Sequence, residues 1–150
     1  MKILGGENPL RPIPERALGS GATSAVASPK LDFRPIETVA ELDAALAEAR
    51  GARMPVMLDF TAEWCVSCKE MERFTFSDEG VRAKLDDFVL LQVDVTRNTP
   101  EDKALLQRFN LFGPPGYIFF ASSGKEQTDL RVIGFKPAGE FLRILDQVSA

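Results

Sequence analysis

Histidine is absent from this chain of 150 residues, and cysteine occurs only twice. Without histidine, neither a Ser-His-Asp nor a Cys-His nucleophile can be assembled within the chain, so acid–base assistance must come from carboxylates or thiols. A zinc site needs about four ligands, and two cysteines could hold zinc only together with carboxylates or a second chain. We therefore expect no bound metal and no bound cofactor.

Long apolar runs and a strong charge imbalance are also missing. The longest apolar stretch, residues 117–121, is far too short to span a bilayer. Gly5 and Gly6 follow the first four residues, which leaves no room for the apolar region of a secretory signal. The net charge is −4 with mixed signs and does not indicate binding to nucleic acid or to an anionic membrane. Taken alone, these features predict a cytosolic protein.

Residues 1–30 differ in composition from the rest of the chain. They contain four prolines, several glycines and serines, and no aromatic residue. Such a segment buries too little apolar area to offset the entropy of ordering it. We predict a flexible linker over residues 1–30 and a single folded domain over residues 31–150. In the alternative interpretation, a few apolar residues such as Ile3 and Leu10 dock on the domain.

From residue 33 onward, helix and strand signals alternate. Capping residues and hydrophobic periodicity predict helices over residues 38–51, 65–74, 77–85 and 99–109 and from Pro137 onward. Apolar and β-branched runs predict strands over residues 56–61, 88–95, 117–121 and 128–135, the last two joined as a hairpin. Strands separated by helices pair in parallel, whereas a hairpin is antiparallel. We predict an α/β fold with a mixed central β-sheet flanked by helices, ending in a β-hairpin and a helix.

Both cysteines lie in one motif, Cys65-Val66-Ser67-Cys68, between the predicted strand 56–61 and the helix that follows it. A C-x-x-C at a strand-to-helix junction indicates a redox-active dithiol/disulfide pair. The helix N-terminus presents unpaired N–H groups to whichever sulfur becomes a thiolate. The alternatives are a structural disulfide and a metal site. A structural disulfide would stabilise the fold only weakly, because the loop that it closes is so short.

The segment Phe112-Gly113-Pro114-Pro115-Gly116 precedes the predicted hairpin. X-Pro bonds are the only ones with an appreciable cis population, and cis prolines are typical of constrained turns. A trans loop is the alternative if Pro115 is considered alone. Because the segment lies between a helix and a buried strand, we predict a cis peptide bond between Pro114 and Pro115.

Taken together, the Trp64-Cys65-x-x-Cys68-Lys69 motif, Asp59 upstream and the Gly-x-Pro before the hairpin resemble the thioredoxin family. More specifically, segments 56–72, 75–78, 90–96 and 131–135 resemble the C-terminal, thioredoxin-like periplasmic domain of DsbD-type thiol:disulfide interchange proteins. The resemblance covers about residues 33–148. One departure is Gly116, because the family usually has a β-branched residue after the cis-proline. This change would loosen the backbone that pairs with an incoming peptide.

The resemblance implies that the chain is an excised domain of a longer membrane protein, with residues 1–30 as its tether. Such proteins relay electrons from a transmembrane module through this domain to an N-terminal periplasmic module. The implied partners are therefore the other domains of the same protein, and the isolated domain is expected to be a monomer. The implied location is periplasmic and tethered to the inner membrane, which replaces the cytosolic prediction. The resemblance also links the chain to cytochrome c biogenesis.

The implied mechanism assigns a role to each cysteine. Cys65, nearer the helix N-terminus and the more exposed, attacks the partner's disulfide, and the more buried Cys68 resolves the mixed disulfide. The carboxylates of Asp59, Glu63 and Glu72 oppose the helix N-terminus in setting the pKa of Cys65. A thiolate without special stabilisation makes the reduced form a better electron donor, which favours a reductase over an oxidase.

Further roles are expected around the cysteines. Asp59 is predicted to exchange a proton with Cys68, because an unpaired buried acid would otherwise be costly. Substrate docking is predicted for Trp64, Val66, Pro114 and Pro115, although Trp64 has the alternative of a core position. Two other functions remain open, a general disulfide reductase or isomerase and a non-catalytic adaptor with this fold.

Overall fold

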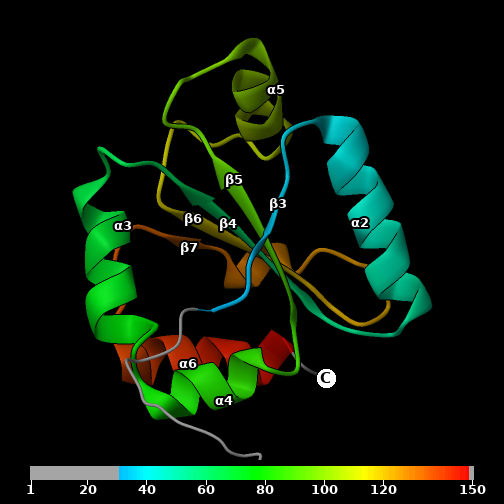
Figure 1. The fold of residues 1–150 in the computed structure, drawn as a ribbon. Coiled ribbons are helices and arrows are strands. Elements are labelled where there is room, and N and C mark those ends of the chain that lie inside the picture. The colour runs from blue at the N-terminus through cyan, green and yellow to red at the C-terminus, as the bar shows by residue number, and fades with distance from the viewer. Residues whose placement is uncertain (1–30, 149–150) are drawn as a thin grey trace, which may run out of the picture. The chain divides into compact units, whose positions relative to one another are not determined.

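Residues 31–148 are described by a computed structural model, in which five strands form one sheet (Figure 1). The strands lie in the order β3-β5-β4-β6-β7. Their bounds are β3 (Arg34–Pro35), β4 (Val56–Thr61), β5 (Val89–Asp94), β6 (Gly116–Phe120) and β7 (Val132–Ile133). The linker predicted over residues 1–30 lies outside the described residues, so it stays a prediction.

Helices cover both faces of the sheet. Their bounds are α2 (Val39–Gly51), α3 (Val66–Glu70), η1 (Met71–Thr75), α4 (Glu79–Leu85), α5 (Pro100–Arg108), η2 (Thr128–Leu130) and α6 (Ala138–Val148). Buried residues of α2 and α5 pack in one apolar cluster, and those of η1, α4 and α6 pack in another. Figure 1 shows the same division, with α2 and α5 separated by the sheet from α4 and α6.

The central strand β4 pairs in parallel with β5 and antiparallel with β6, so the sheet is mixed as predicted. Successive side chains of a strand point to opposite faces. Leu58 and Phe60 therefore pack with α2 and α5, whereas Met57 packs with η1 and α6. Asp59 lies on the same face as Met57, and this places a carboxyl group in an otherwise apolar layer. The predicted α/β, thioredoxin-like fold class is confirmed.

Polar side chains cap the N-termini of three helices at the positions that the sequence predicts. The side chains of Thr38, Asp78 and Thr99 each accept a hydrogen bond from the backbone N–H three residues later. Asp102 returns the contact by accepting from the backbone N–H of Thr99 at 3.0 Å, which completes a capping box. These caps satisfy N–H groups that have no partner within the helix.

The strand predicted over residues 128–135 forms only in part, although its antiparallel pairing with β6 is as predicted. Thr128–Leu130 form the 3₁₀ helix η2, and only Val132–Ile133 pair with β6. Gly134, with φ at 90°, then turns the chain away from the sheet. The turn over residues 122–125 does form, because the Gly124 N–H donates to the carbonyl of Ala121 at 2.8 Å.

Two other elements differ from the prediction. The helix predicted over residues 65–74 is divided into α3 and the π-helix η1, in which the Phe76 N–H donates to the carbonyl of Met71 at 2.8 Å. The strand β3 has no counterpart among the predicted elements, because two residues are too few to show a period. It forms through its parallel pairing with Leu91 and Gln92 of β5.

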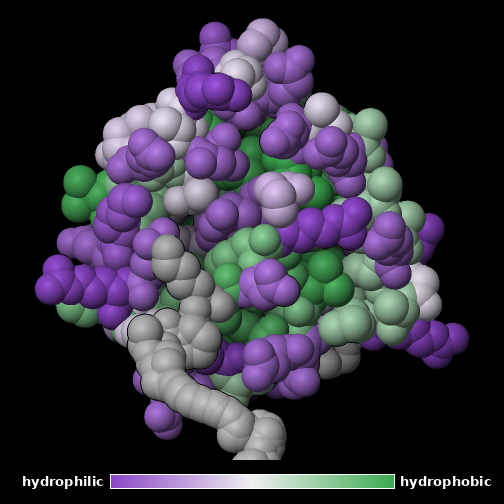
Figure 2. Space-filling model, viewed as in Figure 1, coloured by the Kyte–Doolittle hydropathy of each residue, from purple (hydrophilic) through white to green (hydrophobic). Residues whose placement is uncertain are grey.

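Polar and charged side chains cover much of the face shown in Figure 2, and apolar residues gather in patches between them. This mixture fits the small net charge of −4. Six large apolar side chains of the described residues are exposed, namely Trp64, Val66, Phe74, Phe112, Ile133 and Phe135. Single exposed apolar residues are common on proteins, so their position relative to the cysteines decides whether they matter.

Candidate active site

A disulfide joins Cys65 to Cys68, with the two Cα atoms 5.3 Å apart. Cys65 is the N-cap of α3, and its Sγ accepts a hydrogen bond from the backbone N–H of Cys68 at 3.1 Å. After reduction, this N–H and the end of the helix favour negative charge on the Cys65 sulfur. Cys65 is 6% exposed and Cys68 2% exposed, so Cys65 is the more exposed of two buried residues.

Asp59 lies on β4, six residues before Cys65, and is 3% exposed. Its Oδ2 accepts a hydrogen bond from the Gln92 side chain at 3.1 Å, but its Oδ1 is buried without a partner. Burial raises the pKa of Asp59 to about 7, the hydrogen bond from Gln92 opposes this shift, and the charge of Glu72 adds to it. The carboxyl group can therefore gain or lose a proton near neutral pH.

Sequence reasoning missed Gln92, although a signal was present. Gln92 is an uncharged polar residue within the apolar run of β5, and the parallel register places it opposite Asp59. Tyr117 was missed as well, and the antiparallel register of β6 places it on the other side of Asp59. Burial raises the pKa of Tyr117 above its usual value, and the charges of Asp59 and Glu72 raise it further. Tyr117 therefore stays neutral.

The two predicted glutamates are placed differently. Glu72 lies on η1, exposed to solvent, and its charge reaches both Asp59 and Tyr117. Glu63 is exposed in the turn before Cys65 and is not among the charges that shift the pKa of Asp59. Glu72 is therefore the glutamate whose charge acts on Asp59, and the predicted effects of both glutamates on the pKa of Cys65 stay predictions.

The peptide bond between Pro114 and Pro115 is cis, as predicted. Pro115 is buried, and its carbonyl accepts a hydrogen bond from the Gly134 N–H at 3.2 Å. Gly116 pairs with Phe60 at the end of β4. Because the C-x-x-C motif follows β4, this register brings the cis-proline and the disulfide to the same edge of the sheet.

Packing explains why a glycine, Gly116, follows the cis-proline in this chain. A Cβ on Gly116 would lie 3.0 Å from the side chain of Leu111. That contact is closer than ordinary van der Waals packing allows, so Leu111 fills the space that a β-branched residue would need.

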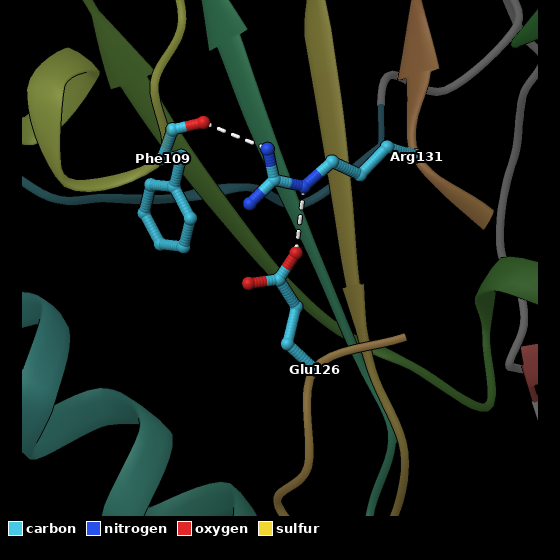
Figure 3. A network of polar contacts seen from close by, with 3 residues as sticks. All are labelled: Phe109, Glu126 and Arg131. Atoms are coloured by element: carbon cyan, nitrogen blue, oxygen red, sulfur yellow. Dashed lines mark hydrogen bonds and ion pairs between the residues drawn. The ribbon is translucent and has the colours of Figure 1, made fainter. Parts of the chain in front are cut away.

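Arg131 joins the residue that precedes the cis-proline loop, residues 110–115, to the segment that follows β6. Figure 3 shows its side chain reaching between Glu126 and the backbone of Phe109. Its Nε donates to Glu126 Oε2 at 2.7 Å, and its Nη1 donates to the Phe109 carbonyl, also at 2.7 Å. Phe109 is the C-cap of α5, and Arg131 directly precedes β7. Only the resemblance of segment 131–135 pointed to this region, and it assigned no role to Arg131.

Of the four predicted docking residues, Trp64 and Val66 are exposed, whereas Pro114 is half-buried and Pro115 is buried. Trp64 is 59% exposed and Val66 is 72% exposed, so the alternative of a core position for Trp64 is wrong. Two residues that sequence reasoning missed, Phe112 in the cis-proline loop and Ile133 opposite Gly116, are also exposed. Exposed apolar side chains therefore flank both the C-x-x-C turn and the cis-proline.

A disulfide at the start of a helix, a cis-proline at the same sheet edge and a buried acid on the central strand define a thiol–disulfide oxidoreductase with a thioredoxin-like fold. Comparison with known proteins agrees. The family described as thioredoxin-like matches residues 37–122. The chain belongs to this family.

Closer similarity is found to thiol:disulfide interchange proteins. DsbD of Ralstonia nicotianae is 50% identical over 144 residues, which cover 94% of this chain and 23% of that protein. DsbD of Klebsiella pneumoniae is 48% identical over 131 residues, which cover 87% of this chain and 21% of that protein. The chain thus spans less than a quarter of the length of these curated relatives.

Solved structures give the same answer. The oxidised C-terminal domain of Neisseria meningitidis DsbD superposes with a TM-score of 0.65 at 38% identity, covering 77% of this chain and 99% of that domain. A thioredoxin from Thermus thermophilus superposes with a TM-score of 0.62 at 33% identity, covering 79% of this chain and 88% of that protein. The similarity to the C-terminal domain of DsbD, inferred from the sequence motifs, is confirmed.

No helix within residues 31–148 has the combination of length and hydrophobicity that a bilayer crossing requires. No three histidine, cysteine or acidic side chains in this range come together as ligands for a metal ion.

Proposed function

We propose that this domain relays electrons in the reductase direction, from a membrane-embedded module to a periplasmic partner domain of the same protein. The observation that carries the proposal is the Cys65–Cys68 disulfide next to β4, the strand that carries the buried acid, in a chain that is 50% identical to a DsbD over 94% of its length. The absence of histidine supports the direction, because no cationic residue between the cysteines stabilises the thiolate.

The relay needs four sulfur atoms and no other redox group. The Cys65 thiolate of the reduced domain attacks one sulfur of the partner's disulfide, which breaks that bond and forms a mixed disulfide. Cys68 then loses its proton and attacks the Cys65 sulfur, so the partner leaves as a dithiol and the domain is oxidised. Two electrons have moved to the partner. We propose that no metal or organic cofactor takes part.

Asp59 is the proposed acceptor of the Cys68 proton. Its Oδ1 has no hydrogen-bond partner, and its pKa of about 7 allows it to take up a proton and release it again near neutral pH. The domain returns to the dithiol form by the same steps in reverse, in which the dithiol of the membrane-embedded module attacks the Cys65–Cys68 disulfide.

The proposed location of the domain is the periplasm, at the surface of the inner membrane.

The test is electron transfer between purified domains. The reduced domain is mixed with the disulfide-bonded N-terminal periplasmic domain of the same protein, and thiols are trapped at short times. We expect Cys65→Ser to abolish transfer and Cys68→Ser to accumulate a mixed disulfide with the partner. Normal turnover by Cys68→Ser would refute the assigned roles.

Two other outcomes separate the alternatives. Reduction of insulin as fast as reduction of the partner domain would indicate a general disulfide reductase. Full activity in cells after replacement of both cysteines by serine would indicate a non-catalytic adaptor. The relay requires slow insulin reduction and complete loss of activity in the double variant.

A further inference from the structure

Thr96 contacts the two residues that directly precede Cys65. It lies in the turn between β5 and α5, and its hydroxyl oxygen accepts a hydrogen bond from the Glu63 backbone N–H at 2.9 Å. Its carbonyl oxygen accepts a second one from Trp64 Nε1 at 3.1 Å. One residue, distant in sequence, thus holds both the backbone and the indole ring next to the attacking cysteine.

Asp94, the last residue of β5, holds Thr96 in turn. Its Oδ1 accepts hydrogen bonds from the Thr96 backbone N–H at 2.9 Å and from the Thr96 hydroxyl. Because a hydroxyl has one proton, donation to Asp94 leaves its lone pairs for the N–H of Glu63. The bonds form a chain in one direction, from the Glu63 N–H through the hydroxyl to a carboxylate, which strengthens each of them.

The neighbouring backbone supports the same arrangement. The Val95 N–H donates to the carbonyl of Thr61 at 2.8 Å, which ties the end of β5 to the end of β4. Asp94 and Thr96 are therefore anchored to the end of the sheet by backbone pairing. Trp64, by contrast, is 59% exposed and has little packing to fix its ring.

We propose that Asp94 and Thr96 are positioning residues that hold the Trp64 indole in a docking-ready orientation beside Cys65. An exposed side chain loses rotamer freedom when a partner covers it, and a ring that is already held loses less. The pair thereby increases affinity for the partner without touching the reacting sulfurs. The inference rests on the proposed function, because the partner is the one that the relay reduces.

The test compares Thr96→Val with Thr96→Ser. Valine keeps the shape of threonine but removes the hydroxyl, whereas serine keeps the hydroxyl and serves as the matched control. Trp64 is the only tryptophan of the chain, so fluorescence anisotropy reports on this ring alone. Thr96→Val keeps the backbone carbonyl that the indole contacts but removes the hydroxyl bonds to Glu63 and Asp94 that hold this carbonyl in place. We therefore expect Thr96→Val to lower the anisotropy and to raise KM for the partner domain roughly fivefold, the size of one hydrogen bond, with kcat unchanged.

A merely structural role would give a different pattern. Positioning leaves the midpoint of the Cys65 thiolate titration and the reduction potential of the cysteine pair unchanged, and Thr96→Ser behaves as the wild type. Asp94→Ala should reproduce the effect of Thr96→Val, and the double variant should be no worse than either single one. Equal losses in the serine and valine variants, or wild-type anisotropy and KM in Thr96→Val, would overturn the proposal.

The two arms separate this inference from the proposed function. Anisotropy is measured on the isolated domain and tests the hold on Trp64 without any partner. If wild-type domain failed to reduce the partner while Thr96→Val still lowered the anisotropy, the relay would be refuted and the positioning of Trp64 would stand.

Discussion

Asp59 should make the domain less stable as the pH rises, and Asp59→Asn should remove that dependence. The carboxyl group has a pKa of about 7 in the folded protein against an ordinary value of 3.8. The folded state therefore holds the proton more tightly than the unfolded state does. Stability is fully present below pH 3.8 and is lost as the pH rises through about 7, because the unfolded state releases its proton first.

The size of the effect follows from the separation of the two pKa values. About three pH units correspond to roughly 4 kcal/mol of unfolding free energy when the loss is complete. Between pH 5 and pH 8, the loss should be roughly 2 to 3 kcal/mol. The cause is burial, since Asp59 is 3% exposed and only one of its oxygens has a partner.

Urea denaturation at several pH values measures this loss. The disulfide is kept oxidised so that no thiol titrates, and the free energy of unfolding is plotted against pH for the wild type and for Asp59→Asn. The amide can leave a buried N–H without a partner, which shifts the level of the curve but not its slope. The comparison therefore uses the slope, which should be flatter in the variant between pH 5 and pH 8.

An exposed carboxylate provides the control. Glu101→Gln, in the first turn of α5, should keep the slope of the wild type. Parallel curves for the wild type and Asp59→Asn would refute the reasoning, since the buried carboxyl would then have the same proton affinity in both states.

Three further outcomes are expected. Glu72→Gln removes a negative charge near the site, so the thiolate absorbance of Cys65 should titrate at lower pH, and an unchanged midpoint would count against the electrostatic explanation. Gln92→Leu removes a hydrogen bond that lowers the pKa of Asp59, so infrared titration of the carboxyl group should show a higher midpoint, and a lower one would contradict the assignment. Arg131→Met removes the hydrogen bonds to the Phe109 carbonyl and to Glu126, so urea denaturation should show a loss of roughly 2 kcal/mol. A loss of the same size in Arg131→Lys would be expected if the two-pronged geometry matters more than the charge.

Features set by neighbouring residues could be predicted from the sequence. The C-x-x-C motif at a strand-to-helix junction, the helix caps at Thr38 and Thr99 and the cis-proline depend on residues only a few positions apart. The period of apolar residues likewise predicted the main helices and the central strand. Each of these patterns reflects local hydrogen bonding or local steric restriction, which the chain carries wherever it folds.

Tertiary structure alone decided which distant residues meet. Gln92 and Tyr117 reach Asp59 only through the register of β5 and β6 against β4, and Thr96 reaches Trp64 only because β4 and β5 end side by side. The short strand β7 shows the same limit, since its flanking residues carry strand propensity but their pairing stops where the chain turns away. Register and burial come from packing of the whole domain, and the raised pKa of Asp59 is a consequence of that packing.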